Sequence, residues 1–244
     1  MAEKKKILYI VEAMGGGVFT YIVDLANELV NKYDMYIAYA VRKQTPKNYK
    51  DYFDKRIHLI EVKNFRRAID PMKDIAAFFE VKKIAAEIKP DIIHLHSSKA
   101  GAIGRMAFNG KIPMFYTPHG YSFLMENYKP MKRRMFKLIE SVCAKRNCTT
   151  ISCSVGEHQE SLKLTKHATY VNNGMLLKYL DKDKFENVLV CSQDFHEEDY
   201  KGLVISFEQI EMTRAIGGND LKAIKEVRAL IKKYKPDIVY CLNF

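Results

Sequence analysis

The feature that most constrains the fold is an apolar strand that leads into three glycines and then into an amphipathic helix. Residues 7–11 form a continuous apolar run, which is typical of a strand buried on both faces of a parallel sheet. Gly15, Gly16 and Gly17 follow, and apolar residues then recur at helical spacing over residues 21–29. This order predicts a βαβ opening in which the helix N-terminus faces the carboxyl edge of the sheet.

The alternation of strands and helices continues through most of the chain. Further strands are predicted at residues 35–41, 58–62, 92–96, 114–117 and 149–152, and helices at 74–89, 100–108, 132–144 and 158–164. This alternation predicts right-handed crossovers, and hence an α/β fold with a Rossmann-like, doubly wound parallel sheet of about seven strands. Ligands of such sheets bind at the carboxyl ends of the strands, where the motifs rich in Gly, His and Ser also fall.

The C-terminal part of the chain repeats an earlier segment. Residues 220–239 align without a gap to residues 74–93, with 8 identities in 20 positions. Both copies carry Lys-Pro-Asp ahead of a β-branched strand, and residues 185–191 occupy the place that residues 33–39 have in the first copy. An internal repeat of this length indicates that one supersecondary unit occurs twice.

The repeat divides the chain into two predicted domains. Residues 1–175 form the first, and residues 176–244 form a partial repeat that resembles residues 29–96 and adds a truncated α/β unit. For this second part we expect two or three strands and one long helix over residues 220–234. It lacks a counterpart of the glycine turn.

The net charge of +11 is unevenly distributed. Residues from 176 onward hold 11 Lys and Arg against 12 Asp and Glu, a net charge of −1, so residues 1–175 carry +12. A basic domain attracts anions, which include nucleic acids, phosphorylated small molecules and acidic membranes, although a solvated surface without a specific partner has the same composition. No RNA-binding fingerprint accompanies the charge, so nucleic acid is not an expected partner.

Composition narrows the class of protein further. The 244 residues are 48% hydrophobic, enough to fill a core, yet no apolar run reaches the length of about 18 residues that spans a bilayer. The apolar stretch after the basic N-terminus is too short for a signal peptide. The five cysteines form no CxxC pair and have no zinc-site spacing. We therefore expect a cytoplasmic protein with reduced thiols and no metal.

His119 stands at the end of the strand predicted at residues 114–117 and is followed by Gly120. An imidazole at that edge can donate a hydrogen bond or move a proton near neutral pH. A structural role alone would also account for a single histidine.

A second histidine motif follows the strand at residues 92–96. His94 and His96 point to one face of that strand, which would allow metal binding, but no third ligand with a suitable spacing accompanies them. Ser97, Ser98 and Lys99 come next, at a strand-to-helix turn, and suit the binding of a hydroxyl or phosphate group better than a metal.

Basic residues alternate with apolar ones around the start of the helix at 132–144. They are Lys129, Lys132, Arg133 and Arg134, with Met131, Met135 and Phe136 beside them. This mixture suits contact with an anionic membrane surface, although a solvated helix face has the same pattern.

Several catalytic classes find no support in the chain. The glycine turn lacks the third glycine of a dinucleotide-binding fingerprint, which argues against hydride transfer. Gly-x-Ser-x-Gly, the Walker lysine motif and HExxH do not occur, so serine hydrolases, nucleoside triphosphatases and zinc proteases are not indicated.

Five stretches in order resemble the N-terminal, acceptor-side domain of family-4-type retaining glycosyltransferases, which have the GT-B fold. They are residues 15–29, 89–105, 116–121, 151–164 and 171–175. The resemblance is strongest to bacterial enzymes of exopolysaccharide or lipid-linked glycan synthesis. It implies transfer of a sugar from a UDP- or GDP-sugar to a glycan or lipid-linked acceptor, with no cofactor. It also implies retention, assisted by the donor's own phosphate, and peripheral binding at the inner face of the membrane.

The resemblance also assigns roles to residues. Gly15, Gly16 and Gly17 would meet the donor diphosphate; His119 would act beside the transferred sugar as the catalytic residue; His96, Ser97, Ser98 and Lys99 would shape the acceptor side; and Lys129, Lys132, Arg133 and Arg134 would contact an anionic membrane. Asn173-Gly174 would be the exit into the interdomain linker.

One part of the family pattern is not found. Members hold the nucleotide sugar in a second domain through a pair of glutamates, and no such motif is recognisable after Met175. Two functions therefore stay open: a glycosyltransferase, whose donor domain a dimer or partner chain supplies, and a non-catalytic acceptor-binding or membrane-docking module or inactive remnant. A third, less favoured function is that of a nucleotide-sugar epimerase, because such epimerases share the fold.

Overall fold

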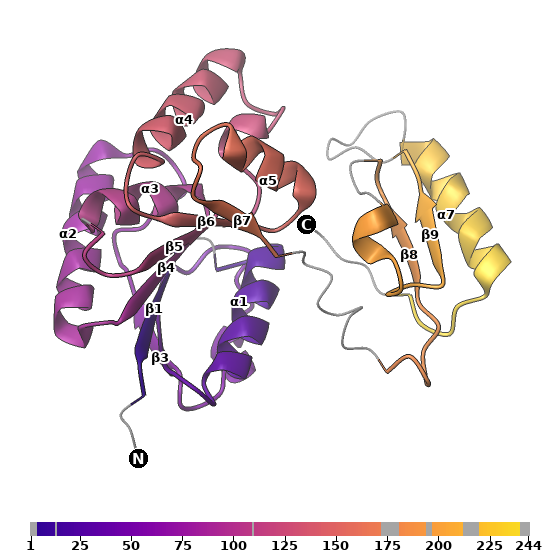
Figure 1. Ribbon diagram of the computed structural model, residues 1–244, viewed down its shortest axis with the longest axis horizontal. Coiled ribbons are helices and arrows are strands. Elements are labelled where there is room, and N and C mark those ends of the chain that lie inside the picture. Colours follow the sequence, from indigo (N-terminus) through magenta and orange to yellow (C-terminus); the bar gives the residue numbers. More distant parts are fainter. Residues whose placement is uncertain are drawn as a thin grey trace. The chain divides into compact units, whose positions relative to one another are not determined.

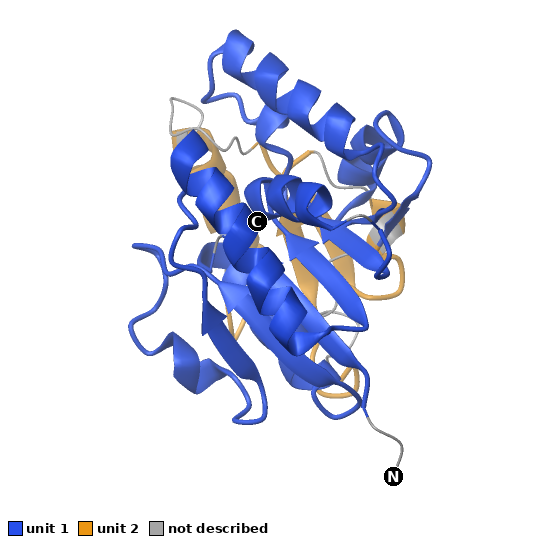
Figure 2. Ribbon diagram, turned by 90° about the vertical axis from the view of Figure 1, so that its left-hand side faces the viewer, with its two compact units in different colours: residues 1–170, 242–244 blue, residues 171–241 orange. Residues whose placement is uncertain are grey.

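The computed structural model describes residues 4–12, 14–108, 110–171, 181–193, 197–211 and 220–239. The chain divides into two compact units, one built on Met1–Tyr170 and one on Val171–Cys241 (Figure 2). The boundary expected after residue 175 and the expected exit motif Asn173-Gly174 lie outside the described residues.

The first unit is a parallel sheet of seven strands. These are β1 (Lys6–Val11), β2 (Asp34–Tyr39), β3 (His58–Glu61), β4 (Ile92–His96), β5 (Met114–Thr117), β6 (Thr149–Ser152) and β7 (Ala168–Tyr170). Their order in the sheet is β3-β2-β1-β4-β5-β6-β7, and every pair is parallel. The expected α/β, Rossmann-like fold is confirmed. The strand that the periodicity did not locate is β7, which has three residues.

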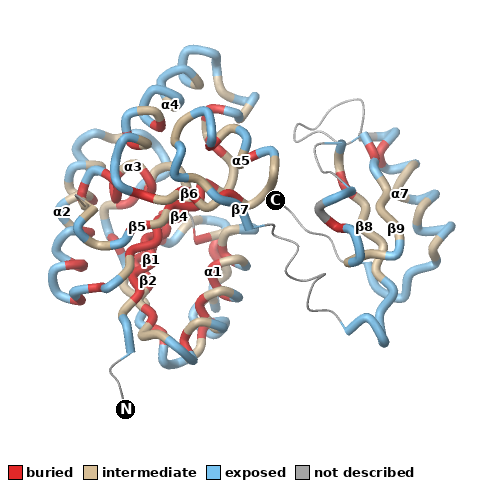
Figure 3. Tube along the Cα trace, viewed as in Figure 1, coloured by how far each residue is buried: buried red, intermediate tan, exposed pale blue. Residues whose placement is uncertain are grey.

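Helices cover both faces of this sheet (Figure 1). They are α1 (Gly16–Leu29), α2 (Pro71–Ile88), α3 (Ser98–Ala107), α4 (Pro130–Cys143) and α5 (Val155–Leu162). Alternate residues of β1 pack on opposite faces of the sheet. Tyr9 packs with Ile22 of α1 on one face, and Leu8 packs against α2 and α3 on the other. Buried residues follow the central strands (Figure 3), so the ends of β1, β4 and β5 are held rigidly.

Helices α2 and α5 each begin three residues earlier than their apolar periodicity predicted, because capping residues set their starts. Helix α2 begins at Pro71, where Asp70 caps the helix by accepting a hydrogen bond from the Lys73 N–H. Helix α5 begins at Val155, because the Ser154 hydroxyl accepts from the Glu157 N–H at 3.2 Å.

The second unit repeats part of the first. It contains β8 (Val188–Cys191), a short 3₁₀ turn (Glu197–Tyr200), β9 (Ser206–Gln209) and α7 (Asp220–Tyr234), and the helix has the bounds expected for it. In the first unit, β2, a 3₁₀ turn (Tyr49–Tyr52), β3 and α2 follow in the same order.

The register of the two strand pairs is also the same. Tyr36 pairs with His58 in the first unit, and Val188, its aligned counterpart, pairs with Ser206 in the second. The match continues through all four pairs, as far as Tyr39 with Glu61 and Cys191 with Gln209. Both strand pairs are therefore built to one plan.

Burial distinguishes the two copies. Ala85 of α2 and Ile93 of β4 are buried in the first unit, where both belong to one hydrophobic core with residues of β1. Their aligned counterparts Ile231 and Val239 are 41% and 58% exposed. Among the described residues, β8 pairs only with β9, so the second unit shows a two-stranded sheet.

Candidate functional site

Three loops converge at the carboxyl edge of the sheet in the first unit. The strand register places Val11, the last residue of β1, beside His96 of β4, and His96 beside Thr117 of β5. The glycine turn, the loop that follows His96 and the loop that carries His119 are therefore neighbours. This is the edge at which doubly wound sheets bind their ligands.

The glycine turn forms the N-terminus of α1. Gly15 is the N-cap residue, Gly16 has a φ of 58°, and both Gly16 and Gly17 are exposed. Gly15 has no side chain that could cap the helix, and no acidic residue lies in the first turn of α1. The first N–H groups and the positive end of the helix dipole are thus left for an anion.

The loop after β2 supports the glycine turn. The Arg42 side chain forms an ion pair with the buried carboxylate of Glu12, and the Thr45 hydroxyl donates to the Met14 carbonyl. A Cβ atom on Gly15 would lie 3.1 Å from the Gln44 Cβ, which is closer than ordinary contact. Burial, together with the neighbouring Arg67, lowers the pKa of Arg42. Sequence reasoning did not select Arg42.

Three histidine side chains lie together at the ends of β4 and β5. His94 and His96 are on the same face, as expected, with ring centroids 4.0 Å apart. The His96 Nδ1 lies 3.1 Å from the Nε2 of His119, and the His94 Nε2 lies 2.8 Å from the Thr117 hydroxyl. The Nε2 of His96 is buried without a hydrogen-bond partner among the described residues.

His119 is held in an unusual backbone conformation. Its φ is 53°, in the left-handed region, and Gly120 follows with a φ of 88°. The ring of Tyr21 meets the His119 ring edge to face at 4.8 Å. The Cys153 thiol lies 3.6 Å from the His119 Nδ1, so both ring nitrogens already have protein neighbours.

Burial keeps the three rings neutral. It lowers the pKa of His94 and of His119 to about 3, and the pKa of His96 lies well below its ordinary value because of burial and the two neighbouring imidazoles. Burial raises the pKa of Tyr21 in turn. The cluster can therefore exchange hydrogen bonds near neutral pH, and it does not supply a charged acid.

The residues after His96 are not equally available. Ser97 has a φ of 74° and starts α3 without bonding the helix through its side chain. The Ser98 hydroxyl accepts from the Ser122 N–H at 3.4 Å. The Lys99 ammonium lies 2.7 Å from the Asp74 carboxylate and also donates to the Ala68 carbonyl, so it ties α3 to α2.

The predicted basic cluster lies at the start of α4. Lys129, Lys132 and Arg134 are exposed, whereas the Arg133 guanidinium donates to the Phe123 carbonyl at 2.9 Å. Apolar side chains of α4 are also exposed, with Met131 at 83% and Leu138 at 66%. No helix in the described part of the chain is long and apolar enough to cross a membrane.

Besides Arg42, the structure adds three residues that sequence reasoning did not select: Tyr21, Cys153 and Glu157. Cys153 follows β6, so the rule that ligands meet the carboxyl ends of the strands would have found it. Tyr21 lies on a helix, where no sequence signal separated it from ordinary helical positions. Glu157 completes the capping-box pattern Ser154-x-x-Glu157, which could have marked it as part of a helix start. In the described residues, no group of three His, Cys, Asp or Glu side chains is arranged to hold a metal ion.

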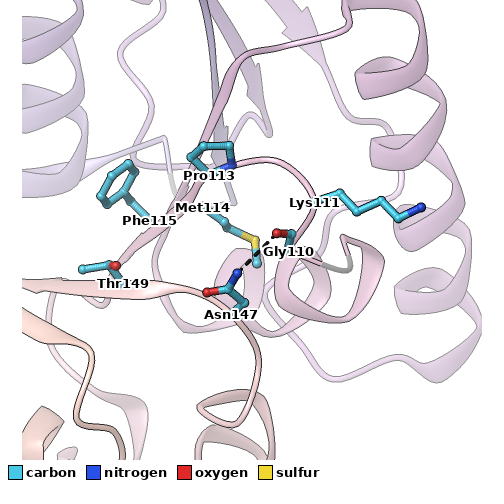
Figure 4. Close-up of a pocket in the computed structure, with 7 residues that line it drawn as sticks. All are labelled: Gly110, Lys111, Pro113, Met114, Phe115, Asn147 and Thr149. Atoms are coloured by element: carbon cyan, nitrogen blue, oxygen red, sulfur yellow. Dashed lines mark hydrogen bonds between the residues drawn. The ribbon is translucent and has the colours of Figure 1, made fainter.

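A shallow depression lies at the opposite end of the strands (Figure 4). Met114 and Phe115 from the start of β5 line it together with Lys111, and the Asn147 amide donates to the Gly110 carbonyl at its rim. It is on the amino side of the sheet and is therefore separate from the site that contains His119.

Two family models match the chain. Residues 15–175 match Glycosyltransferase Family 4, and residues 163–244 match the Glycosyl transferase 4-like family. The second match covers the predicted repeat.

Two curated bacterial proteins are similar to parts of the chain. The UDP-Gal:alpha-D-GlcNAc-diphosphoundecaprenol alpha-1,3-galactosyltransferase of Escherichia coli is 34% identical over 113 residues, which are 45% of this chain and 28% of that protein. An uncharacterized 41.2 kDa protein in the cps region of Klebsiella pneumoniae is 28% identical over 200 residues, 77% of this chain and 51% of that protein. The chain thus spans about half or less of the relatives that it matches.

Solved structures agree with the fold. Sucrose-phosphate synthase from Thermosynechococcus elongatus superposes with a TM-score of 0.53 at 15% identity, over 95% of this chain and 68% of that one. Anabaena Alr3699/HepE, in complex with UDP and glucose, gives 0.52 at 14% identity, over 96% and 67%. A UDP-N-acetylglucosamine 2-epimerase gives 0.51 at 14% identity, over 78% and 57%, so this likeness is one of fold alone. On the family match and the Rossmann-like architecture of its N-terminal domain, the chain belongs to glycosyltransferase family 4.

Proposed function

We propose that this protein takes part in the transfer of a sugar from a UDP- or GDP-sugar to a glycan or lipid-linked acceptor in the synthesis of a cell-surface polysaccharide. The observation that carries the proposal is the convergence of the uncapped, glycine-rich N-terminus of α1 with the neutral His119 cluster at one sheet edge. The names of the Escherichia coli and Klebsiella pneumoniae relatives support this class of substrate.

The glycine turn is proposed to meet the donor diphosphate. Gly16 and Gly17 expose backbone N–H groups at the positive end of α1, and the absence of side chains allows phosphate oxygens to approach them closely. Arg67 adds positive charge beside this end of the sheet, whereas the charge of Arg42 is offset by its ion pair with Glu12. This anion site needs no metal ion.

His119 is proposed to bind the transferred sugar through one exchangeable nitrogen. Its Nε2 is held at 3.1 Å by His96, whereas its Nδ1 faces the Cys153 thiol at 3.6 Å. A thiol is a weak hydrogen-bond partner, so a sugar hydroxyl can replace it with a gain in bond strength. A neutral imidazole then stabilises the sugar without competing for the negative leaving group. Retention, with the donor phosphate assisting, belongs to this proposal.

The donor-holding half is proposed to come from a dimer partner or a second chain. The described part of the second unit offers a two-stranded sheet and α7, and the glutamate pair that holds the nucleotide sugar in the family is not recognisable in its sequence. The competing proposal is a non-catalytic module that binds the acceptor or docks on the membrane. It is favoured by the engagement of both His119 ring nitrogens within the protein.

The test is release of nucleoside diphosphate by the purified full chain, supplied with UDP- and GDP-sugars and a bacterial lipid extract. UDP-galactose is the first donor to try, since the Escherichia coli relative's name specifies it. His119→Ala should abolish turnover, and His167→Ala, which removes an exposed imidazole, should leave it unchanged. A folded chain that releases no nucleotide, alone or with extract proteins added, would establish the non-catalytic module instead.

A further inference from the structure

The loops that follow β5 and β6 are joined by one carboxylate. The Oε1 of Glu157 accepts from the Gly120 N–H at 2.6 Å, and its Oε2 accepts from the Cys153 N–H at 2.7 Å. Glu157 is 9% exposed and lies in the first turn of α5. Short bonds from backbone N–H groups to a carboxylate are among the stronger hydrogen bonds in proteins.

The turn that contains Gly120 has a backbone conformation that contacts from outside the turn must stabilise. His119 is not a glycine, yet its φ is 53°, and Gly120 continues in the left-handed region at 88°. Such a conformation is unfavourable for a non-glycine residue and persists where the surroundings over-determine it. The bond from the Gly120 N–H to Glu157 falls directly after the strained residue, where it can fix the turn.

One helical turn after Glu157, the same face of α5 forms a second set of hydrogen bonds to the two loops. The Ser161 hydroxyl lies 2.8 Å from the Tyr121 hydroxyl and 2.8 Å from the Ser152 hydroxyl, and it donates to the Glu157 carbonyl at 2.9 Å. Ser161 thereby connects the end of β6 to the loop of β5. Positions i and i+4 of a helix share a face, so α5 holds both loops along one line.

We propose that Glu157 is a positioning residue, whose carboxylate fixes the left-handed turn at His119 and so holds the His119 ring between His96 and Cys153. The inference rests on the proposed role of His119 in sugar transfer, but its direct consequence is local. Without the carboxylate, the Gly120 and Cys153 N–H groups lose their bonds, the turn relaxes and water reaches the ring and the thiol.

Glu157→Gln is the informative substitution, because an amide of the same shape keeps one accepting oxygen and presents an N–H₂ group where the second was. Glu160→Gln is the matched control: it lies on the same helix, and its carboxylate pairs with Lys163 instead of either loop. Glu157→Asp serves as a second variant that keeps the charge but shortens the reach, so it restores at most one of the two bonds.

The readout is imidazole nitrogen NMR on the full chain, with the His119 signals assigned by their loss in His119→Ala. In the unchanged protein and in Glu160→Gln, the His119 ring should stay neutral on lowering the pH to 5, since burial keeps its pKa near 3. In Glu157→Gln its pKa should rise by at least about one unit toward the ordinary value. Cys153 should then react faster with a thiol reagent, and Glu157→Asp should fall between.

Identical His119 titration and Cys153 labelling in Glu157→Gln, Glu157→Asp and Glu160→Gln would overturn the proposal. A drop in thermal stability alone, with the His119 signals unmoved, would likewise leave Glu157 as a structural residue and overturn it. The measurement needs no substrate, so it fails separately from the proposed sugar transfer, which nucleotide release tests.

Discussion

The imidazoles of His96 and His119 meet through their nitrogens, with the His96 Nδ1 3.1 Å from the His119 Nε2 and the ring planes 26° apart. Both rings are neutral, so a single proton lies between them and the tautomer of one ring fixes that of the other. The outer nitrogen of His119 then faces Cys153 as either a donor or an acceptor. The state of His96 thus controls what His119 can offer a ligand.

This cluster predicts a particular dependence of stability on pH. Burial lowers the pKa of His94, His96 and His119 in the folded state, so below about pH 6.5 the unfolded chain binds more protons. The free energy of unfolding should be insensitive to these groups above pH 7. It should fall between pH 6.5 and 3 by roughly 1.4 kcal/mol per pH unit for each of His94 and His119. Urea unfolding at several pH values measures it.

Removing one of the three buried rings should make that slope shallower. His94→Gln is expected to do so, whereas His167→Ala removes an exposed imidazole and should leave the slope unchanged. A slope that His94→Gln does not alter would show that the ring is protonated in the folded state.

Gly101 of α3 is expected to tolerate no side chain. A Cβ atom there would lie 2.3 Å from the ring of Tyr116, and that ring is fully buried and stacked on the Arg105 guanidinium. Gly101→Ala should therefore lower the free energy of unfolding by about 1–3 kcal/mol. Gly156→Ala in α5 is the control, because its Cβ would meet nothing within 4 Å. It should be neutral or stabilising by up to about 1 kcal/mol. Equal losses in the two variants would contradict the close contact.

The loss of stability on changing Glu140 is expected to depend on whether its buried partner Arg105 is present. The guanidinium lies 2.6 Å from the carboxylate, and the Tyr116 hydroxyl donates to the same carboxylate at 2.9 Å. Glu140→Leu alone strands a buried positive charge and should cost about 3–5 kcal/mol. Chemical unfolding of the double variant Arg105→Met, Glu140→Leu should show a smaller loss than that single change. A double variant with the summed loss would mean that the two residues act independently.

Helix α4 should bind anionic membranes through charge as well as apolar contact. Lys132 and Arg134 are exposed beside Met131, and each basic residue near an anionic surface contributes about 1 kcal/mol. The double variant Lys132→Gln, Arg134→Gln should lower partitioning to phosphatidylglycerol vesicles roughly 30-fold in co-sedimentation. The charge-matched variant Lys55→Gln, Lys83→Gln should change it little. Equal binding to phosphatidylcholine vesicles would rule out the charge contribution.

The two copies of the repeat should differ in hydrogen exchange. Helix α2 buries Val81 and Ala85, while α7 leaves the aligned Ile231 41% exposed. Amides of α7 should therefore exchange faster than those of α2, measured by mass spectrometry on peptides from residues 74–93 and 220–239 of one sample. Equal protection would show that further contacts cover α7 in solution.

Much of the fold was predictable because it follows from local patterns. Apolar runs such as that of β4 and the apolar periodicity of α7 were located from the sequence, and Pro90 marked where the first copy's helix must end. The starts of α2 and α5 were missed, because side-chain caps on Asp70 and Ser154 extend each helix beyond its apolar face.

The site was predictable only in part. Gly15 and His119 could be placed at the carboxyl edge of the sheet, because a strand end and a glycine turn are recognisable in the sequence. Glu157 was not, because its partners Gly120 and Cys153 bond through backbone N–H groups, which any residue carries. The engagement of Lys99 with Asp74 was equally invisible, since it depends on how α3 lies against α2.

The matching registers of β2–β3 and β8–β9 have a consequence for how burial is understood in this chain. One polypeptide holds two versions of the same strand–turn–strand–helix plan, one surrounded by central strands and one with fewer described neighbours. Local sequence sets the shape of each version, while neighbouring strands decide whether its apolar side chains leave water. The two units therefore allow the burial of one structural motif to be compared in two different surroundings within a single protein.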